Sequence, residues 1–191
     1  MECELVRVMY IVIGDLGRLN SGSGVRPNAI YNAFLERGHN VYVLSGFAGR
    51  GEGKQRKQEV IKAIEWAEAN RPDICYIESS TFPMIHSCDY KMINYLYKKK
   101  IPTAYFYRDL YRYFPSLFPR RKGLYNKLKE CYLSVMQKRT DNVLRKVDIV
   151  YFPSREAKAY FDYNRSKELP PAGEMRFLPE HINNKTCIYV G

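Results

Sequence analysis

The chain has 191 residues, of which 46% are hydrophobic and 27% are charged, so it can bury a sizeable core and is not globally disordered. Its formal net charge of +11 favours a polyanionic partner, such as nucleic acid, an acidic membrane surface or a phosphorylated ligand. The sequence contains neither an apolar N-terminal leader nor an apolar run of about eighteen residues, so neither secretion by signal peptide nor a membrane-spanning helix is expected.

The N-terminal quarter predicts a strand, a loop, a helix and a second strand. Arg7–Ile13 is almost continuously apolar, as is typical of a parallel strand buried on both faces. A loop rich in glycine and serine spans Gly14–Gly24, and the predicted helix after it has Pro27 in its first turn and Gly38 just past its end. Val41–Leu44 predicts the second strand, which completes a right-handed βαβ unit.

The glycine loop is a candidate anion site. The N-terminus of a helix presents unpaired N–H groups and the positive end of its dipole, which suits a phosphate. Gly22 and Gly24 allow close approach to the backbone, and Arg26 adds a positive charge. The loop lacks the third glycine of the dinucleotide fingerprint and the Gly-Lys-Ser/Thr of a P-loop, so a plain turn without a ligand stays the alternative.

Strands and helices continue to alternate along the chain. This alternation predicts the α/β class, with a Rossmann-like parallel sheet between two helical layers. Ser154 is a plausible N-cap of a short helix that runs to about Tyr163. The remaining helices are expected at 55–70, 86–99 and 124–146, and the remaining strands at 73–78, 101–107 and 147–152.

The composition changes after Ser166. Leu169–Glu174 has the proline and glycine content of a linker, and Thr186–Gly191 predicts a strand that enters a new glycine loop. We therefore expect one domain over residues 1–168, and a linker with the first strand of a truncated second domain over 169–191. On this interpretation the chain is a fragment of a larger protein.

No metal site or disulfide is expected. The five cysteines stand singly and form no Cys-x-x-Cys pair, which favours reduced thiols in the cytoplasm and argues against structural zinc. The three histidines are equally dispersed along the sequence.

Four segments occur in an informative order: Ser21–Arg26, Leu35–Leu44, Val147–Val150 with Ser154, and Leu169–Gly173. This ordered set resembles the N-terminal half of GT-B glycosyltransferases of the family-4 type. Ile188–Gly191 is similar to the first strand of the second Rossmann domain in that family. The resemblance covers the whole chain.

The resemblance implies an enzyme that joins a sugar from a nucleotide-sugar to a cell-envelope, capsule or lipid-linked acceptor. It implies that the acceptor docks on the N-terminal domain, and that the missing C-terminal domain holds the donor with paired glutamates. The implied reaction retains configuration and needs no metal or cofactor besides the nucleotide-sugar co-substrate. This chain alone should then be inactive, and its expected location is the cytoplasm, as a peripheral protein on the inner face of the membrane.

The resemblance also assigns candidate site residues. Gly22, Ser23, Gly24 and Arg26 match the loop that lies near the donor diphosphate, where N–H groups and a guanidinium stabilise a departing phosphate. Ser23 could equally cap the predicted helix instead of donating to a phosphate.

A second candidate group follows two predicted strands. Tyr107, Arg108 and Asp109 follow one strand, and Glu78 and Ser79 end another, at the sheet edge where α/β proteins bind ligands. Asp109 is a candidate for orienting or deprotonating the acceptor hydroxyl, although relatives often carry a histidine there. An ordinary Arg108–Asp109 surface pair is the alternative.

The region from 120 to 146 carries nine basic and two acidic residues. With its apolar stripe, it predicts a basic amphipathic helix that contacts an anionic membrane surface. A core helix with a solvated face is the alternative. The candidate membrane-contact residues are Arg120, Arg121, Lys122, Lys127 and Lys129, and the stripe comprises Leu124, Leu128, Cys131, Val135 and Val143.

Two other classes compete with the glycosyltransferase. A nucleic-acid-binding module would account for the charge, but the basic residues cluster on one helix and no RNA-recognition, KH or helix-turn-helix signature occurs, so nucleic acid is not the expected partner. A non-catalytic Rossmann-like binding or scaffold domain would account for the fold.

Overall fold

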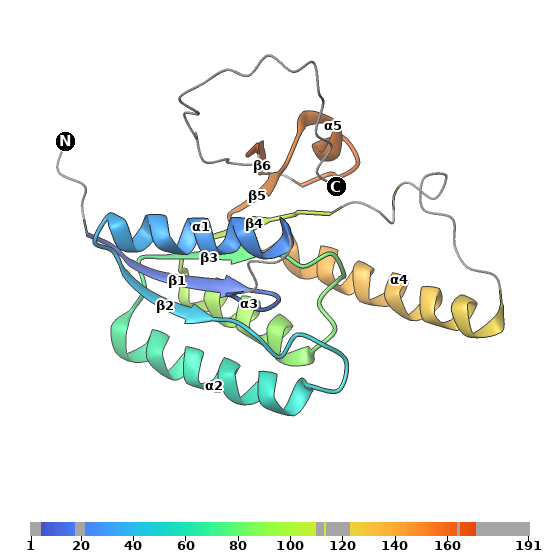
Figure 1. The fold of residues 1–191 in the computed structure, drawn as a ribbon, viewed down its shortest axis with the longest axis horizontal. Helices are drawn as coiled ribbons and strands as arrows, with labels where there is room; N and C mark the ends of the chain where they lie inside the picture. Colours follow the sequence, from blue (N-terminus) through green and yellow to red (C-terminus); the bar gives the residue numbers. More distant parts are fainter. Residues whose placement is uncertain (1–4, 18–21, 110–112, 114–122, 164, 171–191) are drawn as a thin grey trace, which may run out of the picture.

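The computed structural model of the chain describes residues 5–17, 22–109, 113, 123–163 and 165–170. These residues form a six-stranded, all-parallel sheet in the order β2-β1-β3-β4-β5-β6, together with five helices, which confirms the expected Rossmann-like α/β class (Figure 1). The strands are β1 (Arg7–Val12), β2 (Asn40–Leu44), β3 (Ile74–Glu78), β4 (Thr103–Phe106), β5 (Ile149–Phe152) and β6 (Ser166–Glu168). The helices are α1 (Gly22–Glu36), α2 (Gly53–Asn70), α3 (Ser87–Lys99), α4 (Leu124–Leu144) and α5 (Arg155–Lys158).

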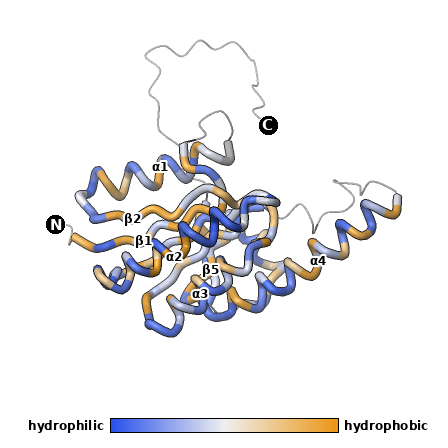
Figure 2. Tube along the Cα trace, turned by 90° about the horizontal axis from the view of Figure 1, so that it is seen from below, coloured by the Kyte–Doolittle hydropathy of each residue, from blue (hydrophilic) through white to orange (hydrophobic). Residues whose placement is uncertain are grey.

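The strand β1 lies at the centre of two apolar layers. Val8 and Tyr10 are fully buried against α1, whereas Met9 and Ile11 belong to the core on the other side of the sheet, which α2, α3 and the end of α4 cover. Figure 1 shows α1 on one side of the sheet and α2 and α3 on the other. In Figure 2 the strands β1 and β2 are mostly orange, in line with the expected two-sided burial of the first strand.

The strand order reverses beside β1. The chain runs from β1 through α1 to β2, and then returns through α2 to β3 on the opposite side of β1. The loops that follow β1 and β3 consequently diverge at the carboxyl edge of the sheet, and open α/β folds bind ligands in the crevice that forms there.

The helix α1 begins earlier than predicted. It starts at Gly22, so Gly22, Ser23 and Gly24 lie within it and Pro27 lies in its second turn rather than its first. The hydroxyl of Tyr10 donates to the Pro27 carbonyl at 3.0 Å and attaches this turn to the sheet. The predicted end is confirmed: Gly38 has a φ of 77°, and its N–H and that of His39 donate to Leu35 and Phe34, as in a Schellman motif.

Two predictions beyond β5 are corrected. Ser154 caps α5 as expected by accepting from Ala157 N–H at 3.2 Å, but α5 ends at Lys158 instead of near Tyr163. After the helix, Phe161 stacks on Phe152 with ring centroids 4.9 Å apart. The strand β6 was not predicted, since its three polar residues carry no apolar alternation and pair with β5 through the backbone.

A fully buried ion pair joins α2 to α3. Arg56 Nε donates to Asp89 Oδ1 at 2.9 Å, and Arg56 Nη1 donates to the Gly46 carbonyl at 3.0 Å. Arg56 thereby connects α2, α3 and the loop that follows β2. Its Nη2 has no hydrogen-bond partner among the described residues.

Removing one member of this pair should destabilise the fold. We expect Asp89→Asn to lower the free energy of unfolding by about 3 kcal/mol, because it leaves a buried guanidinium uncompensated. The double variant Arg56→Met/Asp89→Leu should lose less than the single variant, since it removes both charges. Urea denaturation measures both values.

The control is Asp73→Asn, which breaks the exposed pair between Asp73 and Arg7. Solvent replaces that partner, so its effect should be much smaller. Equal losses for Asp89→Asn and Asp73→Asn would show that burial of the Arg56–Asp89 pair carries no special weight.

Candidate functional site

A pocket of about 420 Å³ opens at the carboxyl edge of the sheet, where the strand order reverses. It lies on the side of the sheet covered by α2, α3 and α4. Residues that follow β1, β2 and β3 form it together with residues from α3 and α4. They are Ile13, Gly14, Ala48, Gly49, Arg50, Ser80, Phe82, Pro83, Ile85, Asp89, Tyr125, Lys129, Tyr132 and Leu133.

The pocket wall is mostly apolar and aromatic, with three charged groups. The Arg50 guanidinium lies over the Tyr132 ring, 5.3 Å from its centroid, so it reaches from the loop after β2 to α4. Lys129 supplies the second positive charge, and Asp89 brings the buried pair with Arg56 to the pocket wall. Few polar groups among aromatic side chains are typical of small-molecule sites.

A polar cluster lies at the ends of β3 and β4. Thr81 Oγ1 donates to Asp109 Oδ2 at 2.7 Å, and Arg108 Nε donates to the same oxygen at 3.1 Å. The backbone N–H of Arg108 donates to Ser79 Oγ at 2.9 Å, which joins the two loops. The candidate residues Ser79, Arg108 and Asp109 therefore lie together, and the local Arg108–Asp109 ion pair, which was the alternative to a functional role, is present.

Ser79, Thr81, Tyr107 and Asp109 also line a narrow cavity of about 10 Å³, which is room for about one water molecule. The Tyr107 hydroxyl points to α4, where it accepts a hydrogen bond from Gln137 Nε2. Burial raises the pKa of Tyr107 far above that of a free phenol. Its contact with Gln137 joins the end of β4 to α4.

Arg26 and Glu78, candidates from two different groups, pair on the other face of the sheet, under α1. Arg26 Nε donates to Glu78 Oε1 at 3.1 Å, and the guanidinium carbon of Arg26 lies 3.8 Å from the centre of the Phe106 ring. The Tyr76 hydroxyl donates to the same Glu78 oxygen at 2.8 Å. Arg26 is therefore committed to a carboxylate within the protein, and it fixes the first turns of α1 against β3.

Glu78 is fully buried, and its Oε2 has no hydrogen-bond partner among the described residues. Burial raises the pKa of Glu78, and the neighbouring Arg26 and Tyr76 oppose this shift.

The structure describes some of the other candidate site residues and not others. Gly22, Ser23 and Gly24 form the first turn of α1, and Gly24 contributes a carbonyl that accepts from Asn28 Nδ2 at 2.8 Å. Lys127 and Lys129 lie exposed on α4. Arg120, Arg121 and Lys122 lie outside the described residues, as does the predicted strand at 186–191.

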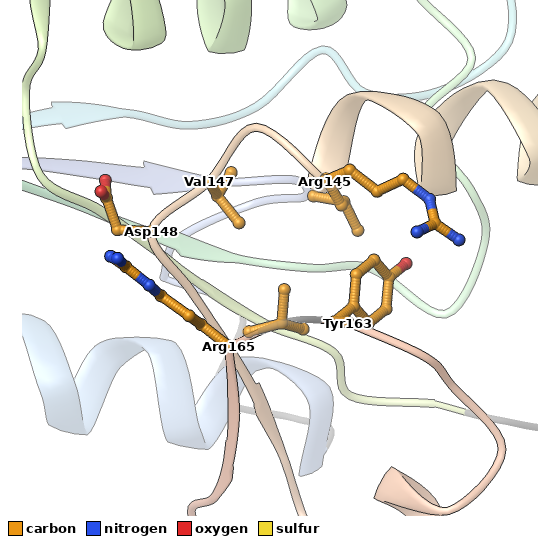
Figure 3. A pocket seen from close by; sticks show the side chains of 7 residues that line it. Arg145, Val147, Asp148, Tyr163 and Arg165 are labelled. Atoms are coloured by element: carbon orange, nitrogen blue, oxygen red, sulfur yellow. The ribbon is translucent and has the colours of Figure 1, made fainter.

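A further pocket of about 230 Å³ lies at the opposite, amino edge of the sheet, before β5 and β6 (Figure 3). Arg145 and Tyr163 stand on one side of it and Asp148 and Arg165 on the other. Asp148 Oδ2 accepts from the Thr103 N–H at 2.8 Å, so its carboxylate connects β4 to β5. This pocket is remote from the candidate site.

Within the described part of the chain, no three His, Cys, Asp or Glu side chains gather as metal ligands would. No helix in that part combines the length and apolar character that crossing a bilayer needs. A scan against models of known protein families gave no match, and a search of curated proteins gave none either.

Sequence reasoning missed Arg56 and Asp89, although a signal was present. Arg56 precedes Val60, Ala63 and Ala67 at spacings of four, seven and eleven, so it occupies the inward-facing line of α2. Asp89 likewise lies on the inward-facing side of α3, with Met92, Ile93 and Leu96. Opposite charges on the inner lines of neighbouring helices indicate a buried pair.

The pH dependence of stability should reveal Glu78. Because its folded pKa is raised above the ordinary 4.5, Glu78 binds a proton more tightly in the folded state. Its contribution to stability is then fully present below pH 4.5 and is lost as the pH rises through the folded pKa. We expect the stability advantage of the native protein over Glu78→Gln to shrink as the pH rises from about 4 to 8.

Denaturant unfolding at several pH values measures this difference in the free energy of unfolding. The contributions of titratable groups that both proteins share cancel in the difference. Glu156→Gln is the control, because the pKa of that exposed carboxyl is lowered. The stability advantage of the native protein over Glu156→Gln should therefore grow as the pH rises. A constant difference between the native protein and Glu78→Gln across the range would contradict the raised pKa.

Proposed function

We propose that this chain is the acceptor-side domain of a nucleotide-sugar glycosyltransferase, acting in the cytoplasm on a cell-envelope, capsule or lipid-linked acceptor. The observation that carries the proposal is the Asp109–Thr81–Arg108 cluster at the carboxyl edge of the sheet, beside the 420 Å³ pocket. The ordered sequence resemblance supports the same function. The donor-binding part is proposed to be a separate, C-terminal domain.

In this proposal Asp109 orients the acceptor hydroxyl. Arg108 and Thr81 both donate to its Oδ2, which fixes the carboxylate at the sheet edge. The aromatic side chains of Phe82, Tyr125 and Tyr132 line the neighbouring pocket and provide flat apolar surfaces on which the C–H faces of a sugar can pack.

The donor diphosphate is proposed to face the first turn of α1. Backbone N–H groups of Gly22, Ser23 and Gly24 belong to that turn and carry the positive end of the helix dipole. Arg26 contributes by holding α1 in place through Glu78, with its guanidinium as a nearby positive charge. Retention of configuration and independence of metal are part of the proposal.

A non-catalytic binding domain is the second candidate. It is favoured by the mutual pairing of Arg108 and Asp109, which leaves the carboxylate engaged before any ligand arrives. The native reading frame separates the two candidates: a following βα-rich domain with paired glutamates supports the transferase, and a stop codon near residue 191 supports the binding domain.

Asp109→Asn tests the catalytic role in the full-length protein. We expect turnover to fall at least about tenfold, equivalent to about 1.4 kcal/mol in the barrier, because the amide orients a hydroxyl less well than the carboxylate. Turnover is followed as nucleoside diphosphate released from a panel of nucleotide-sugars, with an extract of cell-envelope glycans and lipids as acceptor.

Asp73→Asn is the matched control, since Asp73 also pairs with an arginine, Arg7, but precedes β3 at the opposite, amino edge of the sheet. Arg26→Ala should also lower turnover about tenfold. If Asp109→Asn turns over like the native protein, Asp109 has no part in the site. If no donor is consumed by the full-length protein, the transferase proposal itself fails.

A further inference from the structure

The helix α4 consists of two halves with different surroundings. Its C-terminal half is buried in the core through Leu133, Met136, Thr140, Val143 and Leu144. Its N-terminal half extends away from the rest of the fold (Figure 1). Val143 thus belongs to the core, which corrects the single apolar stripe expected from the sequence.

The N-terminal half leaves large apolar side chains in solvent. Leu124, Tyr125, Leu128 and Val135 are 75%, 70%, 63% and 48% exposed. Leu124, Leu128, Cys131 and Val135 follow one another at spacings of four, three and four residues, so they share one helix face. We call this set the α4 stripe.

Positive charge lies close to the α4 stripe. A helix turns by about 100° per residue, so Lys127 borders the stripe, whereas Lys129 lies further round the helix, on the side that lines the pocket. Arg120, Arg121 and Lys122 precede the helix in the sequence, and Glu130 is the only acidic residue from 120 to 131. This half of α4 is therefore strongly cationic.

We propose that the N-terminal half of α4 docks on the surface of an anionic lipid bilayer. The α4 stripe enters the boundary between headgroups and acyl chains, and the nearby lysines extend to the lipid phosphates. An apolar line beside a cluster of cations is complementary to such a surface, where each lysine adds to binding. A protein partner would need an acidic groove to match both features.

The same half of α4 also borders the 420 Å³ pocket, through Tyr125, Lys129 and Tyr132. Docking therefore brings the pocket mouth to the membrane surface. This step rests on the proposed function: the acceptor would be an amphiphile whose anionic head enters the pocket between Arg50 and Lys129 while its apolar tail stays in the bilayer.

Cys131 provides a direct probe, because it is an exposed thiol on the stripe, whereas Cys75 and Cys88 are buried. We would replace Cys3 and Cys187 by serine, attach an environment-sensitive fluorophore to Cys131, and add vesicles of phosphatidylcholine with or without about 30% phosphatidylglycerol. We expect a blue shift and quenching by brominated acyl chains with the anionic vesicles only.

Vesicle sedimentation of the unlabelled protein tests the two parts of the surface. Leu124→Ser/Leu128→Ser should weaken binding to anionic vesicles at least about tenfold, and so should Lys127→Glu/Lys129→Glu. Matched controls are Leu35→Ser/Ile61→Ser, at exposed apolar residues of α1 and α2, and Lys54→Glu/Lys57→Glu, at exposed lysines of α2. Both controls should change binding less than about twofold.

Several outcomes would overturn the proposal. The first is vesicle binding that the leucine variants do not weaken. The second is a probe that is already blue-shifted before vesicles are added, because another part of the chain covers it. The third is a dimer of the native protein that the leucine variants convert to monomers. These measurements need neither donor nor turnover. A native protein that does not bind anionic vesicles therefore refutes the docking surface, while an inactive full-length protein that still binds vesicles refutes only the transferase.

Discussion

Burial of β1 on both faces is the constraint from which the arrangement of the site follows. Val8 and Tyr10 need cover from one layer, and Met9 and Ile11 need cover from the other, so successive crossovers must place α1 and α2 on opposite sides. That requirement puts β2 and β3 on either side of β1 and separates the loops that follow β1 and β3. The 420 Å³ pocket lies where they diverge.

Two buried ion pairs hold that edge from opposite faces. Arg26 and Glu78 fix the start of α1 over the end of β3, and Arg56 and Asp89 fix α2 to α3 and to the loop after β2. Each pair leaves one polar atom, Glu78 Oε2 or Arg56 Nη2, without a hydrogen-bond partner in the described part of the chain. Charges that are expensive to bury are thus concentrated around the candidate site, where their geometry is rigid.

The sequence predicted most of the fold because its strands are continuous apolar runs and its helices have clear boundary signals, as at Gly38 after α1 and Ser154 before α5. It also placed Ser79, Arg108 and Asp109 at the carboxyl ends of two strands, and the structure brings them into contact because parallel strands share one carboxyl edge. It did not predict β6, whose pairing is made by backbone atoms alone. Nor could it predict that Arg26 binds Glu78, because that contact depends on how α1 lies across the sheet.

The strand β6 has a consequence for solubility. It is the edge strand on its side of the described sheet, and its three residues, Ser166–Glu168, are polar or charged. Its neighbour β5 is the apolar segment Ile149–Phe152. An open edge of that kind invites pairing with another chain, whereas a short charged strand discourages it. Truncation before residue 165 would expose the backbone of β5 and leave an apolar edge at which another chain could pair and begin aggregation.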